Sequence, residues 1–131
     1  MKKTLYYILF ASFLYLGALS CGSGRSDNPN TVTSQPVLMA ALPAQGKAGD
    51  TITLQGVGFS IAPNEDIIVL GGITLQALTH DFIPNNALPA NGASEEITFQ
   101  IPANAPVGAG NVLVLVNETP TNGVPFTVET P

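Results

Sequence analysis

The stretch TITLQGVGF, residues Thr51 to Phe59, decides which fold this chain can adopt. Ile52 and Leu54 alternate with polar residues, which is the period of a strand that buries one face and exposes the other. The two glycines that follow let the backbone bend, or approach another backbone, where a side chain would clash. We therefore expect a strand that ends in a tight bend, after which Phe59 turns back into the core.

The residues beyond this stretch form further short apolar or alternating runs. Clusters of Gly, Pro and Asn separate the runs about every ten residues, and no run keeps a helical period. The run NVLVLV is apolar on both faces and is typical of a central strand. The predicted strands are 37–42, 51–55, 66–70, 73–78, 96–101, 111–116 and 124–128. About seven strands in about 95 residues predict an all-β, immunoglobulin-like sandwich.

Five pieces of the sequence, taken in order, resemble the IPT/TIG domains of bacterial surface proteins, plexin-type receptors and Rel-type transcription factors. They are the turn Pro43–Asp50, the block Thr51–Phe59, the strand Ile67–Gly72, the run ITFQIP at Ile97–Pro102 and TNGVPFTV at Thr121–Val128. The block TITLQGVGF carries most of the resemblance. The resemblance implies an immunoglobulin-like fold for residues 36–131, which we take as the folded domain.

The first twenty residues have the layout of a secretory signal. Lys2 and Lys3 precede a run without charge that lasts until Arg25. The apolar part, Leu5 to Leu19, is shorter than the roughly 20 residues that a permanent membrane helix needs. We therefore predict a signal peptide over residues 1–20.

The only cysteine, Cys21, follows small residues in the sequence ALSC. This resembles the lipobox of bacterial lipoproteins, although Ala18 stands where that motif usually has a large aliphatic residue. The resemblance implies that Cys21 receives a lipid, becomes the new N-terminus and anchors the protein to the membrane. The alternative is an incidental thiol after an ordinary cleavage site. One cysteine cannot form an internal disulfide, and a free thiol outside the cytoplasm is a liability.

Residues 21–35 are rich in Gly, Ser, Asn and Thr and predict a flexible tether. A sorting signal close to the cysteine is the alternative interpretation. By the same resemblance, Gly22 after the cysteine favours delivery to the outer membrane of the bacterial envelope, on its periplasmic or surface face. An aspartate at this position would imply retention in the inner membrane.

The composition argues against binding to nucleic acid. The chain has nine acidic residues against four Lys and Arg, a net charge of −5. Such a domain cannot neutralise a phosphate backbone, and it is not attracted to anionic lipid.

The sequence offers little for catalysis, and we expect no enzyme activity, no cofactor and no metal. His80 is the only histidine, so zinc sites with several Cys or His ligands are excluded. No Gly-x-Ser-x-Gly motif is present. Adjacent residues of a strand point to opposite faces, so neither Glu65-Asp66 nor Glu95-Glu96 converges on one substrate atom, and we expect both pairs to be solvated at strand edges. The loop residues with oxygen donors of the kind that binds calcium have no ordered spacing: Asn64, Glu65, Asp66, Asp81, Asn85 and Asn86.

One connection, DFIPNNALPANGASEE at Asp81–Glu96, looks longer than the IPT/TIG family usually has. Its prolines, asparagines and glycine predict neither strand nor helix. Two interpretations stay open, a functional loop and a tolerated surface insertion. If the loop is functional, the candidate binding residues are His80, Asp81, Phe82, Asn85 and Asn86. His80 and Asp81 are otherwise expected to form a solvated turn.

The aromatic residues bear on sugar binding. The chain has no tryptophan, and its tyrosines all lie in residues 1–20. The strand pattern places Phe59, Phe99 and Phe126 in the core, so only Phe82 is expected at the surface. We therefore expect a lipid-anchored, non-enzymatic interaction module, an accessory or assembly component of the cell envelope with a protein partner. The alternative is a glycan-binding accessory lipoprotein of a polysaccharide-uptake system.

Overall fold

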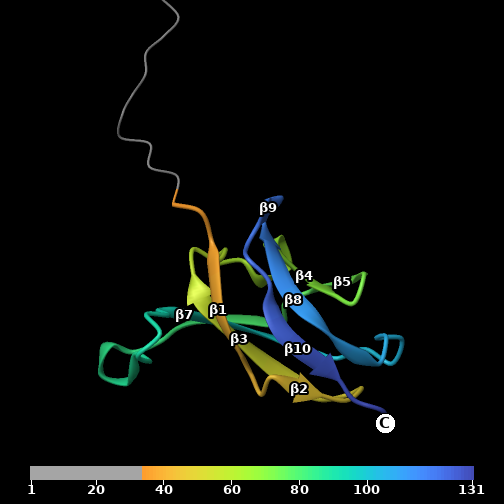
Figure 1. The fold of residues 1–131 in the computed structure, drawn as a ribbon. Helices are drawn as coiled ribbons and strands as arrows, with labels where there is room; N and C mark the ends of the chain where they lie inside the picture. Colours follow the sequence, from red (N-terminus) through yellow and green to blue (C-terminus); the bar gives the residue numbers. More distant parts are fainter. Residues whose placement is uncertain (1–33) are drawn as a thin grey trace, which may run out of the picture. The chain divides into compact units, whose positions relative to one another are not determined.

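The computed structural model describes residues 34–131, which form two β-sheets packed into a sandwich (Figure 1). The predicted signal peptide and Cys21, together with all of the predicted tether except its last two residues, lie outside the described residues. The strands are β1 (Val37–Leu42), β2 (Gln45–Gly46), β3 (Thr51–Val57), β4 (Asp66–Leu70), β5 (Ile73–Gln76), β6 (Thr79–Phe82), β7 (Glu95–Gln100), β8 (Gly108–Val116), β9 (Thr119–Pro120) and β10 (Val124–Val128). Two short 3-10 helices, η1 (Pro63–Glu65) and η2 (Asn85–Ala87), complete the elements. No helix of this part of the chain is long and apolar enough to cross a membrane.

The first sheet has the strand order β1-β3-β7-β6, and the second has the order β2-β10-β8-β4-β5, with β9 paired to β8. All pairs are antiparallel except β2 with β10. The chain changes sheets between β5 and β6, so β6 becomes the edge of the first sheet beside β7. Residues 79–82 therefore lie in the first sheet, whereas β5, which precedes them, lies in the second.

The seven predicted strands are all present; β1, β4 and β10 have the predicted bounds, and the other four have shifted ends. β3 continues to Val57 and β8 begins at Gly108, whereas β5 ends at Gln76 because the chain leaves the second sheet there. Three strands were not predicted, namely β2, β6 and β9. Two of them have only two residues, and β6 (THDF) lacks an apolar alternation because it lies at a sheet edge.

The core lies between the two sheets and is built by the predicted alternation. In β3, Ile52 and Leu54 are completely buried. Phe99 of β7 packs against Phe126 of β10 between the two sheets, with ring centroids 6.3 Å apart and an angle of 61° between the ring planes. The remaining buried members include Leu38, Phe59, Ile68, Leu70, Ile97, Ile101, Val112, Val114, Val116 and Val128. Burial of the three predicted core phenylalanines is thus confirmed.

The bend after β3 depends on Gly56. A Cβ at this position would collide with the carbonyl oxygen of Val37 and would lie 2.6 Å from the ring of Phe59. The absence of a side chain therefore lets β1 and Phe59 approach the end of β3, as the sequence predicted.

Candidate functional site

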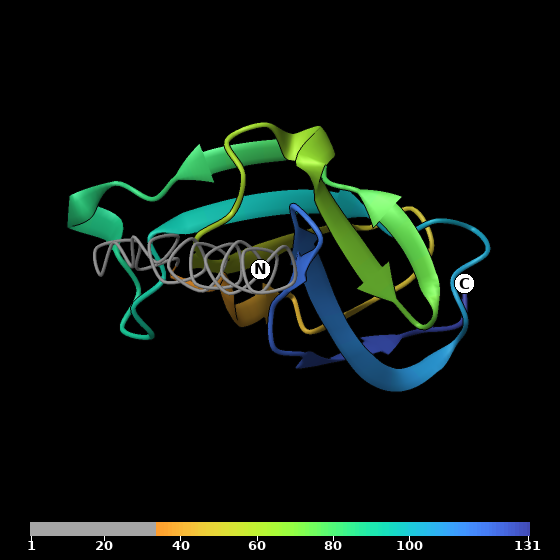
Figure 2. The same ribbon diagram turned by 90° about the horizontal axis from the view of Figure 1, so that it is seen from above.

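The connection between β6 and β7, residues 83–94, projects from the sandwich (Figure 2). Its two ends are fixed to the domain. Ile83 and Ala93 are buried, and the amide of Ile83 donates a hydrogen bond to the carbonyl oxygen of Ser94 at 2.9 Å. The amide of Ser94 donates to the carbonyl oxygen of Gly56 at 3.1 Å. The sandwich therefore holds both ends of the loop, while residues 84–92 extend beyond it.

The tip of this loop is shaped by its own turns. η2 contains Asn85 and Asn86, both exposed, and Ala87 N donates to Pro84 O at 2.8 Å. A second turn is closed by Asn91, whose Oδ1 accepts from the amide of Ala93 at 3.0 Å. The expectation that 81–96 forms neither strand nor helix was wrong, because its ends belong to β6 and β7 and its tip contains a 3-10 turn.

His80 does not lie in a solvated turn, as the sequence suggested. It belongs to β6 opposite Ile97, and its side chain is only 4% exposed. Its Nε2 lies 3.4 Å from Oε2 of Glu95, and its ring meets the ring of Phe82 edge-on, with centroids 5.0 Å apart. The alternation of an edge strand directs this imidazole toward the sandwich.

Glu95 is also not the solvated residue that we expected. Its carboxylate accepts hydrogen bonds from the amides of Gly58 at 3.3 Å and Phe59 at 2.9 Å. These amides belong to the bend that follows β3, so Glu95 holds the bend in place. The sequence gives no local signal for this contact, because the partners are 36 and 37 residues apart.

The expectation for Asp66 was also wrong, since this residue is completely buried rather than solvated. Its Oδ1 accepts from the amide of Ser60 at 3.0 Å, and its Oδ2 has no hydrogen-bond partner. Burial raises the pKa of the Asp66 carboxyl group, and the Ser60 hydrogen bond opposes this rise. Its neighbour Glu65 is exposed and accepts a hydrogen bond from Oγ of Ser60 at 2.5 Å.

The candidate binding residues fall into three environments. His80 faces the sandwich, Asp81 stands opposite Glu96 in the pairing of β6 with β7, and Phe82 is 66% exposed at the end of β6. The two candidate asparagines lie on the loop tip. The expected exposure of Phe82 is therefore confirmed, but the candidates do not converge on one point. Within residues 34–131, no three His, Cys, Asp or Glu side chains are placed to hold a metal ion.

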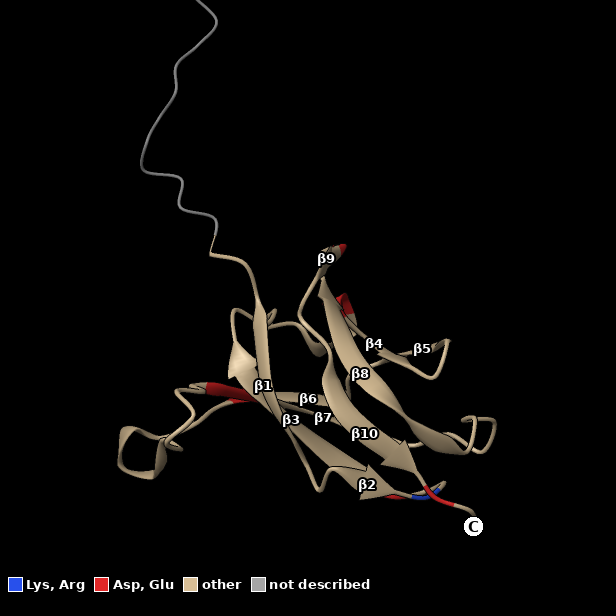
Figure 3. Cartoon of the chain, in the orientation of Figure 1, with Lys and Arg blue, Asp and Glu red and all other residues tan. Residues whose placement is uncertain are grey.

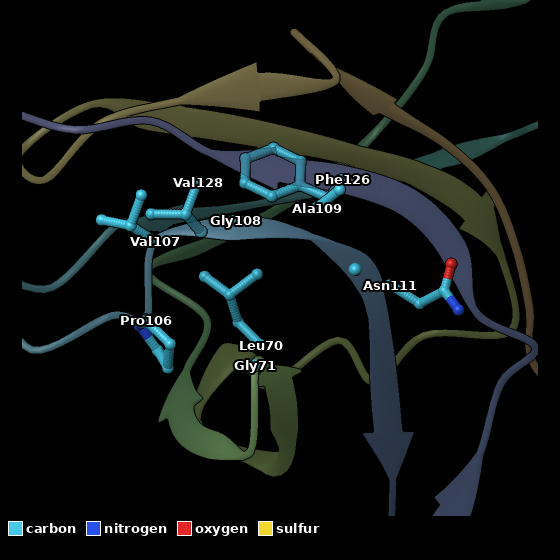
Figure 4. A pocket seen from close by; sticks show the side chains of 10 residues that line it. Leu70, Gly71, Pro106, Val107, Gly108, Ala109, Asn111, Phe126 and Val128 are labelled. Atoms are coloured by element: carbon cyan, nitrogen blue, oxygen red, sulfur yellow. The ribbon is translucent and has the colours of Figure 1, made fainter.

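A small pocket of about 100 Å³ lies away from this loop, where β8 begins (Figure 4). It forms because β4 ends at Leu70, whereas β8 extends beyond this point to Gly108. Its lining has no charged side chain and consists of Leu70, Gly71, Pro106, Val107, Gly108, Ala109, Gly110, Asn111, Phe126 and Val128. This volume is below the roughly 300 Å³ at which pockets for small molecules begin. The sequence carries no local signal for this pocket, because the pocket depends on strand register.

The two sheets, their strand order and the projecting loop define an immunoglobulin-like β-sandwich. The sequence model of the IPT/TIG domain matches residues 36–128. The chain therefore belongs to the IPT/TIG domain family, and its predicted fold is confirmed.

Solved structures similar to this domain include much larger proteins. A γ-cyclodextrin glucanotransferase from alkalophilic Bacillus clarkii has a TM-score of 0.55 and 23% identity over 72% of this chain and 12% of its own. A Bacteroides thetaiotaomicron protein of unknown function has a TM-score of 0.53 and 13% identity over 75% of this chain and 22% of its own. An auxiliary nutrient binding protein from Bacteroides ovatus has a TM-score of 0.49 and 16% identity over 74% and 21% of the respective chains. No curated protein sequence matches this chain.

Proposed function

We propose that this chain is a non-catalytic interaction module, anchored to a bacterial envelope through a lipid on Cys21, that binds a protein partner through the loop between β6 and β7. The observation that carries the proposal is the loop itself. Its ends are fixed by buried residues and main-chain hydrogen bonds, whereas its tip extends beyond the sandwich. Binding residues are often found on such loops, because a rigid scaffold positions them while solvent surrounds them.

Two large apolar side chains support a protein partner. Phe82 is 66% exposed where the loop begins, and Leu88 is 47% exposed on the tip. Exposed large apolar side chains such as these provide the anchors that protein interfaces bury. Immunoglobulin-like modules of this family are in general non-catalytic.

Glycan binding is a second candidate, and one observation favours it. The ring of Phe82 is exposed and is held edge-on against His80, so it offers a fixed aromatic surface. If this ring binds sugar, the affinity for an oligosaccharide of the host's growth medium should vanish in Phe82→Ala. Unchanged affinity in this variant would exclude Phe82 as the sugar platform.

The anchor is proposed from the sequence ALSC and is tested separately. Cys21→Ser should leave the protein unprocessed or release it from membranes, and metabolic labelling with a fatty acid should fail. An unchanged label and mass would contradict lipidation. Fractionation of the envelope of cells that make the unaltered protein tests the proposed placement in the outer membrane. A tether at residues 21–35 would give the domain reach from that membrane.

The main experiment is cross-linked affinity purification of the tagged protein from its own host. One variant replaces residues 84–92 by a short turn and keeps Ile83 and Ala93, which anchor the loop. A finer pair compares Leu88→Ser with Val107→Ser, a matched control because Val107 is 57% exposed beside the pocket and outside the loop. We expect one stoichiometric partner that is lost in the short-loop and Leu88 variants only. A partner retained by both, or no partner for the unaltered protein, would contradict the proposal.

A further inference from the structure

The free edge of the first sheet lies directly beside the proposed binding loop. β6 is the last strand of the order β1-β3-β7-β6, so within residues 34–131 it pairs with β7 alone. An edge strand leaves alternate main-chain amides and carbonyls without a sheet partner. The opposite edge is partly covered, because both the N–H and the C=O of Leu38 in β1 are bonded to the side chain of Asn122. β6 is therefore the more accessible edge for an added strand.

Exposed apolar side chains stand at both ends of this edge strand. Leu78 directly precedes β6 and is 60% exposed. Phe82 is the last residue of β6 and is 66% exposed. The amide of Leu78 bonds to the carbonyl oxygen of Thr98 at 2.8 Å, so Leu78 is held against the sheet. Natural sheet edges are usually protected by charge or proline rather than flanked by large apolar residues. An added strand would cover both side chains.

The charged residues of this edge specify what such a strand must carry. Asp81 and Glu96 are directly opposite each other in the pairing of β6 with β7. Like charges in this position destabilise a sheet. Among the described residues the only Lys or Arg is Lys47, which follows β2, far from the acidic start of β7 (Figure 3). The edge therefore presents two carboxylates that no cation of the described domain neutralises.

This charge disfavours a second copy of the chain as the occupant. If two β6 strands paired with each other, two Asp81–Glu96 pairs would be brought together and repulsion would increase. A strand from another protein with Lys or Arg near Asp81 would instead convert the repulsion into a cross-strand ion pair.

We propose that β6 accepts an added strand from a basic protein segment, with a Lys or Arg beside Asp81 and Glu96 and an apolar residue against Phe82. The inference rests on the proposed function and names the chemistry of its partner. Main-chain hydrogen bonds would supply affinity, and the alternating basic and apolar side chains would supply specificity. The alternative role for Asp81 is to protect a free edge against aggregation.

The test is hydrogen–deuterium exchange of the full chain in detergent with three synthetic peptides at millimolar concentration. The first alternates Lys and Val, the second alternates Glu and Val, and the third is the Lys peptide with a central proline. We expect the first alone to slow exchange in β6 (Thr79–Phe82), on the order of tenfold for the affected amides. No protection of β6, equal protection by the Glu peptide, or protection spread over the domain would overturn the proposal.

Matched variants separate this edge from general electrostatic attraction. The double substitution Asp81→Asn with Glu96→Gln should abolish protection by the Lys peptide. Asp50→Asn with Glu129→Gln, which removes two carboxylates elsewhere on the domain, should preserve it. Protection lost in both double variants, or in neither, would overturn the proposal.

The same variants distinguish failure of this inference from failure of the proposed function. If the host partner is lost on shortening residues 84–92 but is retained by the Asp81 and Glu96 double variant, the loop is the site and the strand-addition proposal fails. If the peptide protects β6 while the short loop retains its partner, strand addition stands and the loop proposal fails.

Discussion

The side-chain amide of Asn122 pairs with the main chain of Leu38 as a neighbouring strand would. Its Oδ1 accepts from Leu38 N at 3.1 Å, and its Nδ2 donates to Leu38 O at 2.8 Å. The two residues are 84 positions apart in the sequence. One side chain before β10 therefore fixes the start of β1, which gives the asparagine of the segment TNGVPFTV a structural role.

Removing this pairing should destabilise the domain. Asn122→Ala leaves the amide and carbonyl of Leu38 without partners, which costs about 1 to 3 kcal/mol of the free energy of unfolding. Asn122→Asp keeps the oxygen that accepts from Leu38 N but loses the donor to Leu38 O, so its free energy of unfolding should fall by only part of this amount. Urea denaturation measures the change, with Asn104→Ala at an exposed position as the control. Equal stability of the two alanine variants would contradict the role of Asn122.

Gly56→Ala should destabilise the domain by about 1 to 3 kcal/mol, because a new methyl group must displace either β1 or the ring of Phe59. Gly110→Ala is the matched control, since nothing lies within 4 Å of a Cβ at that position. Thermal unfolding of the two variants measures the difference. A stable Gly56→Ala protein would show that the close approach is not required.

Glu95→Gln should weaken the bend after β3. One carboxylate oxygen is replaced by an NH₂ group that faces an amide donor, either that of Gly58 or that of Phe59. We expect a loss of about 1 to 3 kcal/mol in the free energy of unfolding. Glu96→Gln has the opposite expectation, a neutral or slightly stabilising effect, because it relieves the repulsion with Asp81. A larger loss in the Glu96 variant would reverse this assignment.

Asp66 should make stability depend on pH in a direction unusual for a carboxylate. Burial raises its pKa in the folded state above the ordinary value of 3.8, so the folded protein binds the proton more tightly than the unfolded chain. The stability that Asp66 contributes is therefore fully present below 3.8 and is lost as pH rises through the raised folded pKa. The measured quantity is the difference in unfolding free energy between the unaltered protein and Asp66→Asn, which cancels most other titrations.

With increasing pH across this window, the unaltered protein should lose stability relative to Asp66→Asn, and above it the difference should stay constant. Asp50→Asn serves as the control, since Asp50 is not a buried residue. A difference that does not change with pH, or one of opposite sign, would contradict the effect of burial.

Local periodicity predicted the core strands because the alternation of apolar residues within each strand determines which side chains are buried. Ile52 and Leu54 in β3 repeat with the period of a half-buried strand, and both are fully buried. β6 was missed because an edge strand needs little apolar surface, and THDF shows none of the alternation on which such predictions depend.

The polar contacts of the candidate site could not be predicted in the same way. Adjacency in the sequence suggested that Glu95 and Asp66 are solvated, but the fold brings each beside the bend that follows β3. Their hydrogen bonds are set by how strands from different parts of the chain are paired. The loop, in contrast, was visible as a long segment rich in proline and asparagine, although its fixed ends were not.

The position of Gly56 has a mechanical consequence. This residue is opposite Leu38 in the pairing of β3 with β1, and its carbonyl oxygen accepts the hydrogen bond from Ser94 at the end of the loop. A pulling force applied at the loop tip and resisted at Ser34 therefore has a short path through the ends of β1, β3 and β7. The start of β1 is also bonded to Asn122, so part of such a force would pass to the connection before β10 and the two sheets would share the load.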